Sequence, residues 1–316
     1  MSIRGTLRVA VGLAMTATIA LTGAFEAGAQ TSPADGAETR ASEQLLHYNH
    51  AYAVVDRETA DAIENSDYLR EFANFEVRTT TGGGLTWTGR YLYGAETYIE
   101  FFGEGDLPGA DALYGASGLG VSTEHAGDLA TVTDRLRDLG IEEPAPYRQT
   151  RDFGDGVRVP WFDTIRTTSD LYDAFDAWSM EYLPEYFADP RGNTGPESYP
   201  GDVSAARYLS DDYQDHQLRD VTQLHLGVPE RDLATTVPLL EAGGYDVETR
   251  GNGTVVVNDG TTTIRLDPVP LDEVGLRGLQ FSLNDATGTR HVEEIGRSTL
   301  TVGPGARAVW TFDAPE

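Results

Sequence analysis

The chain has 316 residues, and 51 acidic against 23 basic residues give it a formal net charge of −28. Every basic residue is an arginine. This balance argues against nucleic acid or an anionic membrane as a partner, because both require a basic surface. The absence of cysteine excludes disulfides, iron–sulfur clusters and thiol nucleophiles, and 40% hydrophobic residues exclude a disordered chain.

The N-terminus has the pattern of a cleavable signal peptide. Two arginines precede an apolar run over residues 9–25, and residues 27–29 (Ala-Gly-Ala) form a small-x-small cleavage motif. We therefore expect a signal peptide over residues 1–29, a flexible leader over 30–43, and a mature protein that is secreted or periplasmic. An uncleaved membrane anchor is the alternative. No later segment is apolar enough to span a membrane, so we expect no membrane contact after cleavage.

Beyond the leader, a pattern of one strand, one helix and three strands begins. A helix with one apolar face follows the first strand, and glycine turns separate the later strands. The elements of this first copy are expected over residues 50–56, 58–72, 75–80, 85–93 and 97–102.

The same pattern recurs further along the chain. The second copy is expected over residues 118–121, 128–139, 147–153, 157–165 and 178–182, and the third over 225–228, 232–242, 245–249, 254–257 and 262–266. A degenerate fourth copy would comprise strands over 276–284, 298–302 and 306–312, with a short helical piece near Val292.

These repeats predict an α+β fold of paired βαβββ modules, three clear copies plus a degenerate fourth. One pair would occupy residues 44–184 and the other 218–316. Residues 185–217 are rich in Pro, Gly, Asp and Tyr, and indicate a linker or a wrapped insertion between the two pairs. We expect a monomer or a loose homodimer.

The module openings at residues 50–56 (HAYAVVD) and 225–229 (HLGVP) recur with closings at residues 98–101 (YIEF) and 180–182 (MEY). In this order they resemble the vicinal oxygen chelate superfamily, which includes glyoxalase I, extradiol dioxygenases and bleomycin-binding proteins. The first two modules look most like the glyoxalase-like branch. The resemblance implies that two modules form a cupped sheet, with metal ligands on the first and last strand of each module.

Carried over to this sequence, the resemblance implies His50, Glu100 and Glu181 as metal ligands, with Gly118 at a fourth position that has no side chain to donate. One imidazole and two carboxylates suit a divalent Fe, Mn, Ni or Zn ion, and Glu100 or Glu181 could also act as a catalytic base. Each glutamate alternates with apolar neighbours, so we expect both to face the cup. A structural, hydrogen-bonded role for His50 is the alternative.

We expect the second pair of modules to carry fewer residues that could ligate a metal. His225 matches His50, but Arg265 stands where the first module has Glu100. A guanidinium cannot ligate a metal, although it can bind an anionic substrate. We therefore expect the second pair to act mainly as a scaffold.

Two functions remain open. One is a metal-dependent lyase, isomerase or dioxygenase that acts on a small substrate with vicinal oxygens. The alternative is a non-catalytic protein that binds and sequesters a small molecule, since one scaffold hosts both uses. Convergence of His50, Glu100 and Glu181 on one point would distinguish them.

Overall fold

The computed structural model describes residues 43–82, 85–168 and 170–315, all within one compact unit over residues 41–316. The predicted signal peptide and residues 30–42 of the predicted leader lie outside the described residues. In the described part of the chain, no helix has the length and apolar character needed to cross a membrane.

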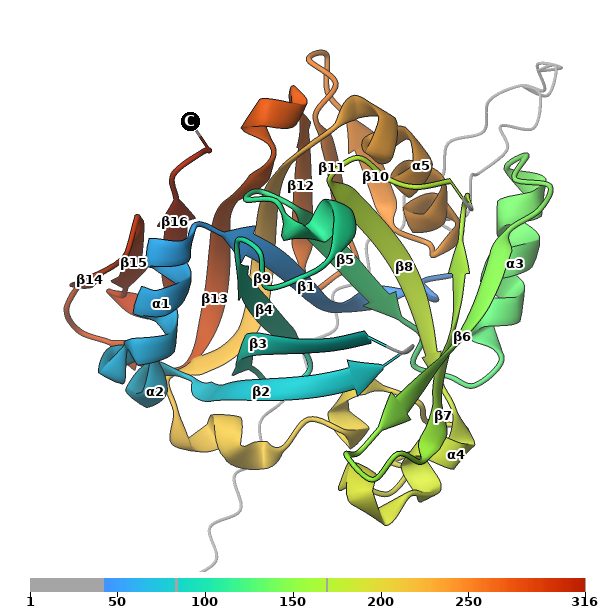
Figure 1. The fold of residues 1–316 in the computed structure, drawn as a ribbon, viewed down its shortest axis with the longest axis horizontal. Coiled ribbons are helices and arrows are strands. Elements are labelled where there is room, and N and C mark those ends of the chain that lie inside the picture. Colours follow the sequence, from blue (N-terminus) through green and yellow to red (C-terminus); the bar gives the residue numbers. More distant parts are fainter. Residues whose placement is uncertain (1–42, 83–84, 169, 316) are drawn as a thin grey trace, which may run out of the picture. The chain divides into compact units, whose positions relative to one another are not determined.

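Eight strands form a closed barrel in the order β1-β4-β3-β2-β6-β7-β8-β5 (Figure 1). The strands are β1 (His47–Val55), β2 (Asn74–Gly82), β3 (Leu85–Tyr93), β4 (Tyr98–Gly103), β5 (Ser117–Ser122), β6 (Ala145–Asp152), β7 (Arg158–Arg166) and β8 (Phe175–Tyr182). Parallel pairing of β1 with β4 and of β5 with β8 requires a crossover in each half of the barrel, and helices supply it.

The first crossover contains α1 (Arg57–Asn65) and α2 (Asp67–Phe72), and the second contains α3 (Asp128–Asp138). One continuous helix was expected over residues 58–72, but Ser66 divides it. The Ser66 side chain accepts a hydrogen bond from the Leu69 N–H and so caps a new helix. Apolar residues on the helix faces pack against the outward-facing residues of β1 and β4, such as Ala51 and Phe101.

A second sheet has the order β10-β11-β12-β9-β13-β16-β15-β14. Its strands are β9 (Leu218–Val228), β10 (Asp246–Thr249), β11 (Val255–Asn258), β12 (Thr263–Pro268), β13 (Gly275–Thr287), β14 (His291–Ile295), β15 (Ser298–Val302) and β16 (Gly305–Phe312). The helix α5 (Glu230–Ala242) follows β9. The chain is therefore a sheet-rich α+β protein.

The predicted helical piece near Val292 is wrong. Val292 lies in β14, which pairs with β15 in antiparallel register. Only residues 288–290 separate β13 from β14, a connection of hairpin length that leaves no room for a helix.

The segment between the two sheets packs against one end of the barrel. It contains α4 (Pro184–Ala188) and short 3-10 turns at Pro190–Gly192, Ala205–Arg207 and Asp211–Asp215. Tyr186 and Val203 from this segment are buried in an aromatic cluster with Phe162, Met180 and Tyr182 of the barrel. The segment thus closes the barrel at this end.

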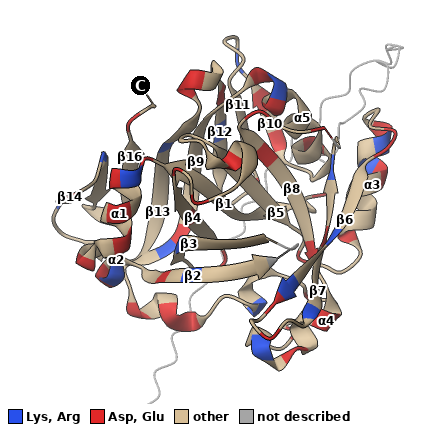
Figure 2. Cartoon of the chain, viewed as in Figure 1, with Lys and Arg blue, Asp and Glu red and all other residues tan. Residues whose placement is uncertain are grey.

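The barrel and the second sheet share a hydrophobic core. Phe101, on the outer face of β4, lies 5.1 Å between ring centroids from Trp310 of β16, and both side chains are fully buried. Acidic residues outnumber basic ones on α1, α2 and α3, at the surface of the molecule (Figure 2). The inner face of the barrel is the place where the predicted site residues would have to meet.

Candidate functional site

The strand register places two of the predicted site residues on the inner face of the barrel. On the parallel pair β1–β4, His50 lies opposite Tyr98 and Tyr52 lies opposite Glu100. His50 and Tyr98 stack at 4.4 Å between ring centroids, and both are inside the barrel with Glu100 two residues further along. His50 and Glu100 therefore face the same interior.

Glycines of β5 make room for the rings of β1. Gly120 lies opposite His50 and Gly118 lies opposite Tyr52. A Cβ atom on Gly118 would overlap the Tyr52 ring, and one on Gly120 would press on the His50 ring. The Tyr52 side chain therefore occupies the space at Gly118, the position at which the resemblance implied a fourth ligand.

His50 is a buried, neutral imidazole. Burial lowers its pKa from 6.5 to about 3, and its side chain also contacts the edge of Trp178 at 5.5 Å between centroids. Its Nδ1 lies 2.8 Å from Oδ1 of Asn49. Since an amide oxygen only accepts, Nδ1 carries the proton and Nε2 is left with a lone pair.

Glu100 is a buried carboxyl group with an unused oxygen. Burial raises its pKa from 4.5 to about 7, an effect that the nearby Tyr91 hydroxyl and Arg78 charge partly offset. Within the described part of the chain, its Oε1 is buried without a hydrogen-bond partner. The oxygen lies over Gly89 of β3, where a Cβ atom would collide with it.

The expectation that Glu181 faces the interior is wrong. Its carboxylate accepts hydrogen bonds from the N–H groups of Gly127 and Leu129, at 3.0 and 2.9 Å, and so caps the N-terminus of α3 outside the barrel. The pairing of β5 with β8 explains why. Gly120 lies opposite Trp178, so the inward-facing residues of β8 are Trp178 and Met180.

The residues present do not fit a metal ion of the vicinal oxygen chelate type. Trp178 occupies the closing position of the second module, and Glu181 points away from His50 and Glu100. Over the described ranges, no group of three or more His, Cys, Asp or Glu side chains is arranged to hold a metal. A histidine and one carboxylate fall short of the three protein ligands that a catalytic metal site uses.

Aromatic side chains surround His50 and Glu100. Tyr52, Tyr98 and Trp178 point inward but remain partly accessible, so solvent reaches this level of the barrel. On β2 and β3, Tyr91 stacks with Tyr93 at 5.5 Å between ring centroids, and the Arg78 guanidinium lies 4.6 Å from the centre of the Tyr91 ring. Neither Arg78 nor Tyr91 was expected from the sequence, although the Tyr-x-Tyr alternation in β3 was a possible signal.

The second sheet contains a His–carboxylate pair at the same register as His50 and Glu100. His225 lies opposite Arg265 on β12, and Gly227 lies opposite Asp267. Asp267 therefore stands where the first module has Glu100, and the expected equivalence of Arg265 with Glu100 is wrong by two residues. His225 Nε2 lies 2.7 Å from Asp267 Oδ2.

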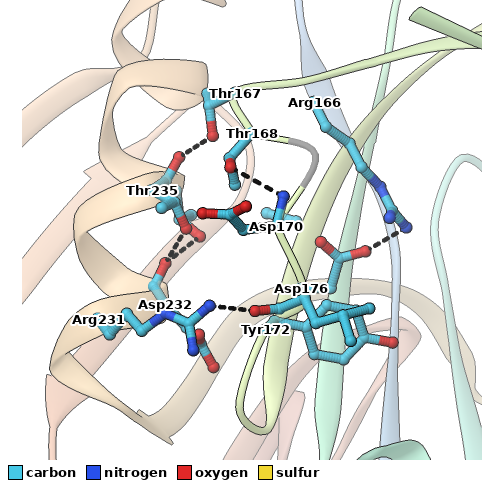
Figure 3. Close-up of a pocket in the computed structure, with 12 residues that line it drawn as sticks. Arg166, Thr167, Thr168, Asp170, Tyr172, Asp176, Arg231, Asp232 and Thr235 are labelled. Atoms are coloured by element: carbon cyan, nitrogen blue, oxygen red, sulfur yellow. Dashed lines mark hydrogen bonds and ion pairs between the residues drawn. The ribbon is translucent and has the colours of Figure 1, made fainter. Parts of the chain in front are cut away.

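A small cavity of about 50 Å³ lies between α5 and the connection from β7 to β8 (Figure 3). The Asp232 carboxylate accepts hydrogen bonds from the backbone N–H groups of residues 173–175, and Arg166 pairs with Asp176 at 2.5 Å. Such a volume holds little more than ordered water. We interpret this cavity as part of the junction between the barrel and α5.

Comparison with protein families gives one match. The model of DUF5829, described as a family of unknown function, matches residues 48–312. A comparison with curated proteins finds no match.

Several solved structures are similar to this one. A hypothetical protein from Staphylococcus aureus has a TM-score of 0.51 and 10% identity, over 82% of this chain and 99% of that chain. Homoprotocatechuate 2,3-dioxygenase from Arthrobacter globiformis has a TM-score of 0.38 and 12% identity, over 73% and 62%. The Mn(II)-bound glyoxalase from Novosphingobium aromaticivorans has a TM-score of 0.33 and 9% identity, over 86% and 84%. The first likeness concerns the fold alone, and the other two are too distant to add to it.

Proposed function

We propose that this chain, which belongs to the DUF5829 family of unknown function, binds a small molecule inside its barrel at His50 and Glu100, without a metal ion. The observation that carries the proposal is the buried Oε1 of Glu100, which has no well-formed hydrogen bond among the described residues, although Tyr91 and Trp87 lie near enough to lower the pKa of the carboxyl group. Leaving such an acceptor unpaired costs about 1–3 kcal/mol, so native interiors contain few of them. A ligand O–H or N–H would satisfy it.

The chemistry of the interior favours a planar ligand with adjacent hydrogen-bond donors. His50 Nε2 and Glu100 Oε1 are both acceptors, and they belong to side chains that lie two residues apart in the register of β1 with β4. The rings of Tyr52, Tyr98 and Trp178 line this interior and remain partly accessible, which favours an aromatic ligand. A small aromatic molecule with vicinal hydroxyl groups combines these features.

A metal-dependent enzyme of the vicinal oxygen chelate type is the weaker candidate. It needs a third ligand, and Glu181 is engaged at the N-terminus of α3 instead. A sequestering protein would also bind a ligand with vicinal oxygens. For this it needs only hydrogen-bond acceptors, and His50 and Glu100 supply them.

The cellular setting is part of the proposal. The N-terminal sequence pattern supports export, so binding would take place outside the cytoplasm. The acidic composition supports a small-molecule ligand over nucleic acid. We keep the monomer or loose homodimer as the proposed assembly.

Calorimetric titration with catechol tests this function, with phenol as the probe that has a single hydroxyl group. We expect catechol to bind the wild type with a Kd at least tenfold lower than that of phenol, a difference of about 1.4 kcal/mol. Glu100→Gln should weaken catechol binding at least tenfold, since the amide turns one acceptor into a donor.

The matched control is Glu181→Gln, which changes the other glutamate of the sequence motif but lies outside the barrel. It should bind catechol as the wild type does. Failure of the wild type to bind catechol, or equal binding by wild type and Glu100→Gln, would contradict the proposal.

A further inference from the structure

The polar face of the second sheet carries a cluster of charged side chains that the barrel site does not use. We define this cluster as His225 on β9, Arg265 and Asp267 on β12, and Arg277 on β13. The opposite face of the same strands is apolar and buried, with Leu224, Leu226 and Leu266 in the shared core. Strand alternation therefore places the cluster on the side of the sheet away from that core.

Asp267 is the centre of the cluster. Its carboxylate accepts hydrogen bonds from Thr254 Oγ1 at 2.6 Å and from Arg265 Nε at 3.0 Å, and it lies 2.7 Å from His225 Nε2. Partial burial raises the pKa of Asp267, but these three donors and the electrostatic interaction with His225 outweigh it and lower the pKa to about 2. The carboxylate thus stays ionised and holds His225 and Arg265 in place.

Arg277 lies beside this centre. Its guanidinium covers Gly227, the residue opposite Asp267, at the place where any other residue would have its Cβ. Its Nη2 donates to the Glu273 carbonyl, but its Nη1 is buried with no acceptor among the described residues. A buried guanidinium nitrogen without an acceptor indicates a missing partner.

Arg265 also keeps a free donor. Its Nε and Nη2 both engage Asp267, in the two-pronged geometry that arginine forms with carboxylates. In the described part of the chain, no hydrogen bond of its Nη1 is found. The cluster therefore combines two guanidinium groups, each with a spare N–H donor, and one carboxylate whose acceptor capacity is already occupied.

We propose that this cluster is a second binding site, for a small oxyanion such as a carboxylate or a phosphate. Oxyanions accept several charge-assisted hydrogen bonds from guanidinium groups in one plane, which point charges such as ammonium do not match. The net charge of −28 does not prevent this, since charges beyond about 8 Å are largely screened at physiological ionic strength. The site is independent of the barrel interior and of its ligand.

Calorimetric titrations of the full chain with inorganic phosphate and with acetate, at constant ionic strength, test the proposal. We expect saturable binding of at least one of the two with 1:1 stoichiometry. Binding of phosphate alone would assign the site to phosphorylated ligands, and binding of acetate alone to carboxylates. Saturable binding of neither anion would overturn the proposal.

Variants locate the site. Arg277→Gln and Arg265→Gln should each weaken anion binding at least tenfold. Because the Arg265 side chain is half-exposed, its variant tests the site even where Arg277→Gln impairs folding. Arg250→Gln is the matched control, because Arg250, the residue after β10, is exposed and its side chain pairs with Glu248 alone among the described residues. Glu100→Gln should also leave anion binding unchanged. Equal loss of binding in the control, or no loss in either cluster variant, would contradict the assignment.

Discussion

Burial determines the protonation of individual residues inside the barrel. His50 remains neutral because burial lowers its pKa to about 3, and Glu100 is raised to a pKa of about 7. A neutral imidazole beside a carboxyl group that titrates near pH 7 differs from the ionised ligand set expected from the sequence. Near His50, the interior can therefore change its charge within the physiological range through Glu100.

The raised pKa of Glu100 predicts a pH-dependent stability. The folded state binds the proton more tightly than the unfolded state, where the pKa is near 4.5. This contribution is fully present below about pH 4.5 and is lost as the pH rises through 7, a change of about 3 kcal/mol. Urea unfolding at about pH 5 and about pH 8 should therefore show a larger stability loss in the wild type than in Glu100→Gln, which keeps the contribution of Asp176, whose pKa burial raises to about 6.

Glu181→Gln is the control for this comparison, and it should keep the pH dependence of the wild type. The same dependence in wild type and Glu100→Gln would mean that the Glu100 carboxyl group is solvated rather than buried.

At the level of secondary-structure elements, strand pairing decides which residues meet. The letters Met-Glu-Tyr at residues 180–182 look like Ile-Glu-Phe at residues 99–101, but the pairing of β5 with β8 gives Trp178 the register position in the second copy that Glu100 has in the first. A slip of three residues moves a side chain to the other face of a strand. Such a slip is invisible in a single sequence because both registers keep the hydrophobic alternation.

Glu181 caps the N-terminus of α3 and does not belong to the barrel site. This role predicts the effect of removing its side chain. Glu181→Ala leaves the N–H groups of Gly127 and Leu129 without their acceptor and should destabilise the fold by about 1 kcal/mol. Glu142→Ala, at an exposed position after α3, is the control and should change the stability by less than about 0.5 kcal/mol. Equal stabilities of the two variants in urea unfolding would contradict the capping role.

At the level of the whole molecule, the sheet-rich α+β class was predictable and the chemistry was not. Glycine turns and apolar alternation located several strands within a few residues, as at β3 (Leu85–Tyr93) and β8 (Phe175–Tyr182), but β9 (Leu218–Val228) begins seven residues before the expected start at residue 225. The expectation that Glu100 lies on the opposite face of β4 from Ile99 and Phe101 agrees with the structure. These features depend on local sequence, where the physical signals are strong.

The features that could not be predicted depend on long-range contacts. The match of Asp267 to Glu100 follows from the register of β12 against β9, and the closure of the barrel end follows from how Tyr186 and Val203 pack. The missing helix in the last module follows from a connection too short to hold one. None of these features changes the hydrophobic periodicity of a single segment.

We propose that the barrel binds its ligand through Glu100 without a metal ion. The most direct measurement is catechol titration of the full chain before and after treatment with a chelator, with elemental analysis of both samples. We expect the same Kd in both samples and no stoichiometric Fe, Mn, Ni or Zn. Catechol binding that the chelator abolishes, that added metal restores, and that Glu100→Gln lacks would contradict it.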